Sequence, residues 1–171
     1  MSKGVWRIVG RFDLLMALQL LVLNHVYLGG FMMPMLYVLF ILMLPTGMKR
    51  IPLLLIAFGT GLLVDVMSNM LGFHALACTV LAMMRILFAD RILTRGEPIV
   101  VEIPGIYSVT PQYFISYLLL MFGAFYLVFF TVEIFGFRSF GSVLLATICS
   151  TVVTTLMAVL YQYIFLKKET I

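Results

Sequence analysis

Six apolar stretches follow one another along this chain, separated by short connections that contain polar residues, glycine or proline. A helix needs about 20 apolar residues to cross the hydrocarbon core of a bilayer, which is about 30 Å thick. The pattern predicts membrane-spanning helices at residues 11–28, 31–44, 52–69, 71–89, 112–132 and 139–166. The second stretch is short and is bracketed by Pro34 and Pro45, so it is either a short or tilted span or half of a re-entrant hairpin.

The composition agrees with a chain that lies in a bilayer. Hydrophobic residues make up 64% of the 171 positions, whereas soluble domains have about 45–50%. Only 11% of the residues are charged, too few to cover a soluble domain. We therefore expect an all-α integral membrane protein with a single transmembrane domain over residues 1–171, its first helix retained because no cleavage site follows. Cys78 and Cys149 lie in apolar stretches and are predicted to be buried thiols rather than a disulfide.

The distribution of Lys and Arg predicts the orientation of the helices. Cytoplasmic loops of membrane proteins carry an excess of these residues. If the N-terminus is cytoplasmic and there are six spans, ten of the eleven basic residues fall on the cytoplasmic side and only Arg138 falls outside. Arg85 is counted inside because its side chain can reach the inner interface from the end of the fourth span. Both termini are therefore predicted to be cytoplasmic, and the net charge of +4 requires no nucleic-acid partner.

The predicted cytoplasmic loop at residues 90–111 is the one long polar segment of the sequence. Its prolines exclude a continuous helix. The sequence IVVEI within it is compatible with a short strand or with a segment on the membrane surface. We expect either a plain linker or a cytoplasmic docking element.

Polar side chains gather near the predicted outer ends of the first, third and fourth spans. They are Asn24, His25, Asp65, Ser68, Asn69 and His74. At 1.5 Å per residue, Asp65 lies about 6 Å below the turn between the third and fourth spans. Helical spacing places Gly61, Asp65 and Ser68 on one face. An acidic side chain exposed to lipid costs about 2.5–3.5 kcal/mol, so this face is predicted to contact protein.

The partner of Asp65 is left open by the sequence. The candidates are His74, Asn24, His25, Ser68 and backbone amides near Gly72. We favour a hydrogen-bonded clasp that joins three spans; a ligand- or partner-binding site and a proton relay are the alternatives. Two histidines and one aspartate can ligate zinc, but no fourth ligand or fixed spacing supports a metal site. No phosphate-binding loop, CxxC, HExxH or nucleophile–base pair is present, so no catalytic, cofactor or metal site is predicted.

Small residues recur every four positions in the sixth span and form a ridge. The ridge residues are Ser142, Ala146, Ser150, Thr154 and Ala158. Such a ridge allows two helix backbones to approach closely. It predicts a packing face, either within this chain or against the transmembrane helix of a partner. The aromatic residues of the fifth span surround that helix and are interpreted as lipid-facing or packing residues.

Two stretches in the first half of the chain carry a recognisable order of residues. They are LNHVYLGGFMMPMLYVLFILMLP at 23–45 and IAFGTGLLVDVMSNMLGFHALACTVLA at 56–82. The defining positions are Asn24, Pro34, Pro45, Gly61, Asp65, Gly72, His74 and Ala75. In order and spacing this pattern resembles MreD, a family of rod shape-determining membrane proteins. The second half of the chain agrees with that family only in length and in the number of predicted spans.

The resemblance implies a non-enzymatic scaffold subunit of the cell-wall elongation machinery in the bacterial cytoplasmic (inner) membrane. Such proteins associate with MreC and, with the MreB filament, the RodA glycosyltransferase and its partner transpeptidase, support lateral wall synthesis and cell shape. The family is similar in fold to the substrate-binding subunits of energy-coupling-factor transporters, which leaves a vitamin- or metal-binding transporter subunit as the alternative. Those subunits commonly carry Ala-x(3)-Ala in the first helix, whereas Leu21 follows Ala17 here, and only the short Gly29-Gly30 turn follows. The sequence therefore favours the scaffold.

Overall fold

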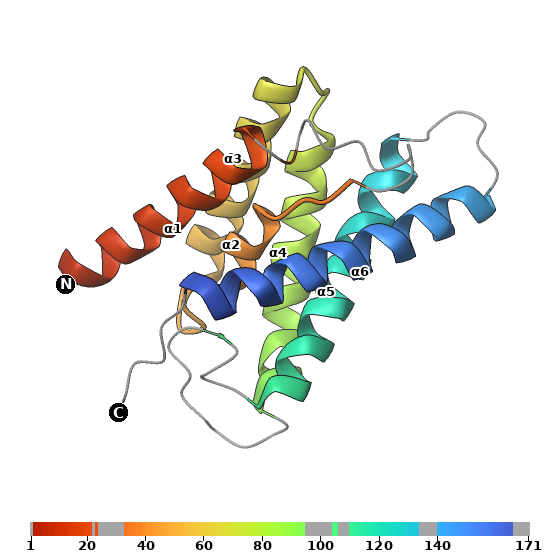
Figure 1. Ribbon diagram of the computed structural model, residues 1–171. Coiled ribbons are helices and arrows are strands. Elements are labelled where there is room, and N and C mark those ends of the chain that lie inside the picture. The colour runs from red at the N-terminus through yellow and green to blue at the C-terminus, as the bar shows by residue number, and fades with distance from the viewer. Residues whose placement is uncertain are drawn as a thin grey trace.

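The computed structural model describes residues 2–21, 23, 33–94, 104–105, 110–133 and 140–165. Within this part the chain forms six α-helices and no strand (Figure 1). They are α1 (Ser2–Leu21), α2 (Val38–Leu42), α3 (Arg50–Ser68), α4 (Phe73–Thr94), α5 (Pro111–Glu133) and α6 (Phe140–Phe165). The helices α3, α4, α5 and α6 pack against one another in chain order. The described part of the protein is therefore all-α, as predicted.

Three helices in the described part are long and apolar enough to cross a membrane, and they cover Arg50–Ser68, Pro111–Glu133 and Gly141–Phe165. A fourth apolar stretch, Phe73–Phe88, is shorter. The chain is thus a membrane protein with long apolar helices. The helices α3, α5 and α6 begin and end within two residues of the predicted spans. Long runs of apolar residues with no proline beyond the first turn explain this agreement.

The first helix differs from its prediction. It covers Ser2–Leu21, whereas the apolar pattern predicts a span at 11–28. No proline or glycine pair interrupts the charged first turns, so the helix extends through them. Of the predicted residues beyond Leu21, the structure describes Leu23 alone. The Gly29-Gly30 turn, Asn24 and His25 lie outside the described residues, as does most of the predicted 90–111 loop, including the IVVEI segment.

The second apolar stretch does not form a spanning helix in the described part. Its helical portion, α2, has only 5 residues, and residues 33–35 before it are not helical. Pro34 lacks an amide hydrogen and disfavours helix in the residue that precedes it. Residues 35–44 are nonetheless almost completely buried. The segment therefore lies at the centre of the bundle rather than against lipid.

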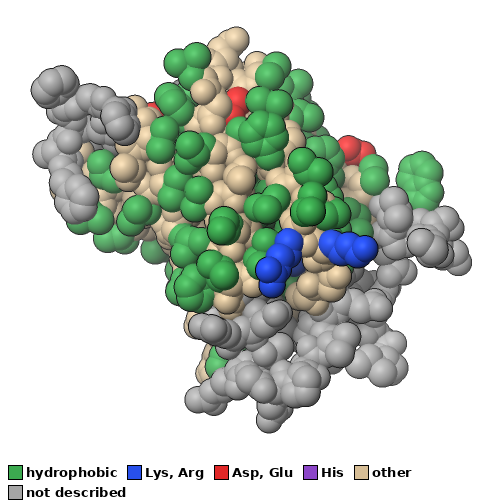
Figure 2. Space-filling model, turned by 180° about the vertical axis from the view of Figure 1, so that it is seen from behind, with side chains coloured by type: hydrophobic (Ala, Val, Ile, Leu, Met, Phe, Trp, Pro, Cys, Tyr) green, Lys and Arg blue, Asp and Glu red, His purple; other side chains and the backbone are tan. Residues whose placement is uncertain are grey.

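The two faces of α3 show how the bundle is arranged. Ile51, Leu55 and Val66 are exposed by 65–72% and form an outward apolar face. Ala57 and Val64 are buried on the opposite face. Figure 2 shows apolar side chains spread over one side of the molecule, with Lys and Arg side chains near one end. Such an apolar exterior is compatible with a lipid environment.

Aromatic side chains of α5 form much of the core. The completely or almost completely buried members are Phe114, Tyr117, Phe122, Phe125, Tyr126 and Phe129. Phe125 packs edge-on against Tyr37, at a ring-centroid distance of 6.4 Å, and is stacked with Phe129 at 6.2 Å. The sequence left these aromatic residues as either lipid-facing or packing residues, and their burial identifies them as packing residues. Cys78 and Cys149 are free thiols; Cys78 is buried as predicted, whereas Cys149 is only half-buried.

Candidate functional site

Asp65 joins α3 to the start of α4 through both oxygens of its carboxylate. The backbone N–H of His74 donates to Oδ1 at 3.0 Å, and that of Ala75 donates to Oδ2 at 2.8 Å. Both amides belong to the first turn of α4, where backbone N–H groups have no partner within the helix. Acidic side chains are favourable at the N-terminal end of a helix, where the helix dipole is positive. Asp65 therefore caps α4 from a neighbouring helix.

The turn between α3 and α4 is built around the same residue. The Asp65 carbonyl accepts from the backbone N–H groups of Asn69 and, at 2.9 Å, Met70. Asn69 adopts the left-handed conformation (φ 52°) that ends many helices, and Gly72 has a φ of +92° that side-chain-bearing residues rarely adopt. Asn69 itself is exposed. Its part in this region is to end α3, so it does not join the buried polar groups predicted with it.

Gly61 allows α3 and α4 to approach closely. A Cβ atom built at Gly61 would lie 2.5 Å from both the Ala75 Cα and the His74 carbonyl oxygen. Only glycine fits this contact without moving a backbone. Asp65 lies one turn further along α3, so the close approach brings its carboxylate to the amides of α4. We call Gly61, Asp65, His74 and Ala75 the α3–α4 clasp.

The His74 imidazole bonds elsewhere. Its Nδ1 lies 2.8 Å from the Tyr37 hydroxyl, and its ring packs against Phe129 at a centroid distance of 4.6 Å. The Cys78 thiol also donates to the Tyr37 oxygen, at 3.8 Å. His74 thus connects α4 to the segment before α2 and to α5. The sequence left both the His74 ring and nearby backbone amides as possible partners of Asp65. The hydrogen bonds of the Asp65 carboxylate go to backbone amides, and the His74 ring bonds Tyr37 instead.

A second group of polar side chains, not expected from the sequence, surrounds the non-helical segment at residues 33–36. Gln19 Nε2 donates to the Pro34 carbonyl at 3.1 Å, and Gln19 Oε1 accepts from the Leu36 N–H at 2.8 Å. The side chain of Gln19 therefore bonds both sides of the proline. The hydrocarbon core offers no water for such backbone groups, so protein atoms must bond them.

Tyr126 of α5 forms hydrogen bonds with the same segment. Its hydroxyl accepts from the Met35 N–H and donates to the Met33 carbonyl, each at 2.8 Å. Thr154 Oγ1 lies 2.6 Å from the same oxygen. Because the single hydrogen of Tyr126 is committed to Met33, Thr154 is the donor in that bond. Ser150 Oγ accepts from the Met33 N–H at 3.2 Å.

Two ridge residues of α6, Ser150 and Thr154, are thereby engaged within the chain. Both side chains are completely buried, and so is Ala158. Ala146 is buried and Ser142 half-buried. At its centre the ridge therefore packs against residues 33–35 and α5 of the same chain. The sequence left packing within this chain and packing against a partner helix as alternatives. The central part of the ridge packs within this chain.

Arg85 is buried rather than extended towards an interface. Only 3% of its surface is exposed, and Nη2 donates to the Leu44 carbonyl just beyond α2. A cation at the end of a helix interacts favourably with its last carbonyl groups. This placement corrects the expectation that the Arg85 side chain reaches the inner interface.

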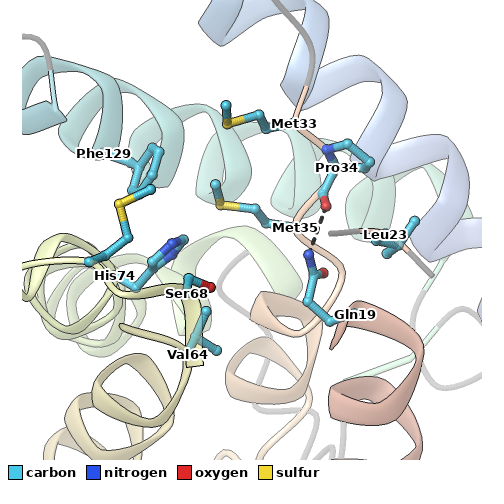
Figure 3. A pocket seen from close by; sticks show the side chains of 10 residues that line it. Gln19, Leu23, Met33, Pro34, Met35, Val64, Ser68, His74 and Phe129 are labelled. Atoms are coloured by element: carbon cyan, nitrogen blue, oxygen red, sulfur yellow. Dashed lines mark hydrogen bonds between the residues drawn. The ribbon is translucent and has the colours of Figure 1, made fainter. Parts of the chain in front are cut away.

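A cavity of about 260 Å³ lies beside the clasp (Figure 3). It is bounded by α1, the segment at 33–35, the α3–α4 turn and α5. Its polar lining comes from Gln19, Ser68 and His74. Within the described residues, no group of three or more His, Cys, Asp or Glu side chains is placed to hold a metal ion.

Comparisons with known proteins do not assign the chain. No family model, curated protein or solved structure matches it. The resemblance to MreD therefore rests on the residues that carry it. In the structure, Gly61, Asp65, His74 and Ala75 are in contact, and Gly72 lies in the turn that joins them.

Proposed function

We propose that this protein is a non-enzymatic scaffold subunit of a bacterial cell-wall elongation complex, similar to MreD, and that its principal partner is MreC. The observation that carries the proposal is the convergence of residues from the family pattern. Gly61, Asp65, Gly72, His74 and Ala75 are separated by up to 14 positions, yet they build one local unit. Because these five residues depend on one another for a single contact between α3 and α4, there is a physical reason for them to occur together.

The other polar contacts fit a structural role. Gln19 and Tyr126 bond the backbone of residues 33–36, and Arg85 bonds the Leu44 carbonyl. Each of these side chains donates at least one hydrogen bond to a buried, partly non-helical segment. This use of polar groups favours a rigid body that partners recognise over a body built around a reaction.

We extend the proposal to topology. Six membrane segments, with both termini in the cytoplasm, place the α3–α4 turn on the outer side of the inner membrane. With the buried Arg85 left out, nine of the other ten Lys and Arg residues fall on the cytoplasmic side, which supports this orientation. In this arrangement Lys49 and Arg50, which are exposed at the start of α3, lie at the cytoplasmic surface. The outward apolar faces of the helices are then available to lipid and to the transmembrane helices of RodA, its transpeptidase or MreC.

The alternative is a substrate-binding subunit of a vitamin or metal transporter, and the cavity beside the clasp favours it. Leu21 in place of the second alanine of Ala-x(3)-Ala opposes it. Co-purification from the native membrane distinguishes the two. The tagged protein is extracted in mild detergent and its partners are identified by mass spectrometry. Recovery of MreC supports the scaffold, whereas recovery of an ATPase module without MreC contradicts it.

A matched pair of variants makes this experiment specific. Gly61→Ala disrupts the contact between α3 and α4, whereas Gly59→Ala adds the same methyl group where no atom lies within 4 Å. The proposal expects Gly59→Ala to retain MreC and Gly61→Ala to lose it. Equal recovery of MreC with a destabilised Gly61→Ala protein would show that the clasp is not part of the partner-binding body.

A further inference from the structure

The cavity beside the clasp has a mixed lining, made of apolar residues and the polar side chains of Gln19, Ser68 and His74. Its apolar lining includes Met33, Met35, Met70 and Phe129. Methionine side chains are flexible and polarisable, and they adapt to ligands of different shape. The volume of about 260 Å³ exceeds the roughly 150 Å³ of an apolar protein cavity that binds benzene. A molecule somewhat larger than one aromatic ring therefore fits.

Of these three polar side chains, the His74 imidazole is 5% exposed and points from α4 into the space beside Met35 (Figure 3). Among the described residues, the hydrogen bond of this ring reaches Nδ1 only, where Tyr37 lies. The Cys78 thiol donates to the Tyr37 oxygen, so the Tyr37 hydrogen is free to donate to Nδ1. A neutral imidazole that accepts at Nδ1 carries its own hydrogen on Nε2. With Tyr37 as the donor to Nδ1, the ring presents an N–H donor at Nε2.

We propose that this cavity is a binding site for a small amphipathic molecule. The ligand has an apolar body of about the size of one substituted ring and one hydrogen-bond-accepting oxygen, such as a carbonyl, which bonds His74 Nε2. A free small molecule and an ester carbonyl of a membrane lipid present the same chemistry. The site is distinct from the proposed partner surface, because it is a recess bounded by α1, the segment at 33–35, the α3–α4 turn and α5, whereas the partner surface is the outward apolar faces of the helices.

The first test measures binding of 4-fluoroacetophenone to the purified full-length protein in detergent by fluorine NMR. We expect saturable binding to the wild type. Ser68→Phe fills the cavity from α3 and should weaken binding at least tenfold. Met67→Phe places the same side chain one residue earlier, where the native side chain is 60% exposed, and should leave binding unchanged. Equal binding to all three proteins would indicate partition into detergent and overturn the proposal.

A second cavity-filling variant guards against loss of folding. Met70→Phe changes a half-buried residue of the turn that also lines the cavity. It should reduce binding in the same way as Ser68→Phe. Binding that survives in a folded Met70→Phe and a folded Ser68→Phe protein would place the probe elsewhere and contradict the site.

The second test addresses the polar group. Tyr37→Phe keeps the ring but removes the hydroxyl that orients His74, so 4-fluoroacetophenone should bind about fivefold more weakly, as expected for one hydrogen bond. The apolar probe 4-fluorotoluene should bind Tyr37→Phe and wild type equally. If both probes respond alike, the N–H donor has no part in binding. A merely structural loss would weaken both.

The source of the natural ligand follows from native mass spectrometry of the protein released from its own membrane. A bound lipid that 4-fluoroacetophenone displaces identifies a lipid ligand, and a bound small molecule that it displaces identifies a free one. An adduct that Ser68→Phe retains in full would contradict the site. Co-purification of MreC tests the scaffold proposal and does not depend on ligand binding in the cavity. The two experiments can therefore fail independently.

Discussion

Replacing Gly61 with alanine should force α3 and α4 apart at the point where Asp65 reaches the amides of α4. The added Cβ would lie 2.5 Å from the Ala75 Cα and from the His74 carbonyl oxygen. Both are backbone atoms of a helix, so no flexible side chain can turn aside. Separation of the helices lengthens the bonds of 3.0 and 2.8 Å from the His74 and Ala75 amides to the carboxylate.

Three effects set the size of the change in the free energy of unfolding. Overpacking of a close contact costs about 1–3 kcal/mol. Loss of a helix cap costs about 0.5–2 kcal/mol. Alanine in place of glycine within a helix gains about 0.5–1 kcal/mol. The net expectation for Gly61→Ala is a destabilisation on the order of 1–4 kcal/mol. At Gly59, where the Cβ would meet no other part of the described chain within 4 Å, only the gain remains.

Thermal unfolding in detergent, followed by reaction of the buried Cys78 thiol with a fluorescent dye, measures both variants. The midpoint temperature should fall for Gly61→Ala and should stay constant or rise for Gly59→Ala. Because the two substitutions are identical in chemistry and lie two residues apart, their difference reports the helix contact. A Gly61→Ala protein as stable as Gly59→Ala would refute the close approach of α3 and α4.

Three further predictions follow from the contacts of single side chains. Asp65→Asn keeps one acceptor oxygen but places an N–H₂ donor against a backbone amide donor. The free energy of unfolding should therefore fall in the order Asp, Asn, Leu at position 65, with about 1–3 kcal/mol lost per unsatisfied group. The same unfolding assay tests this order. Tyr126→Phe should cost at least about 1–3 kcal/mol for the groups it leaves unpaired, measured by the same unfolding assay. An unchanged midpoint temperature would be evidence against the role of Tyr126. For topology, a cysteine at Gly47 in a background without native cysteines should resist an impermeant thiol reagent in intact cells and one at Ser139 should react, whereas labelling at Gly47 from outside would contradict the proposed orientation.

The helices could be predicted where the apolar pattern was sufficient to define them. Long apolar runs with no proline beyond the first turn specify α3, α5 and α6, because a bilayer-length helix bonds their backbone within one segment. The segment at 31–44 is equally apolar, but Pro34 breaks the helix and side chains distant in sequence bond the backbone instead. Gln19 is separated from Leu36 by 17 positions, and Tyr126 from Met35 by 91. The hydropathy pattern does not predict hydrogen-bond partners that are so distant in sequence.

The candidate site was predicted in part. Burial of Asp65 against protein followed from the cost of a carboxylate in lipid, and amides near Gly72 were among its possible partners. The choice between those amides and the His74 ring depends on how closely two helices approach, which Gly61 decides. The importance of Gln19 and Tyr126 was missed. A lone glutamine in an apolar helix, together with a proline inside an apolar stretch, was the available signal.

The measurement that tests the α3–α4 clasp most directly is amide hydrogen exchange at His74 and Ala75, followed by NMR in detergent. Both amides should exchange slowly in the wild type, although they lie in the first turn of α4, where capping normally decides protection. In Asp65→Leu their exchange should accelerate by about tenfold or more, as expected for loss of a buried hydrogen bond, while the amide of Leu81, deeper in α4, stays protected. Unchanged exchange at His74 and Ala75 in a folded Asp65→Leu protein would contradict the account, because the carboxylate would then not be what holds them.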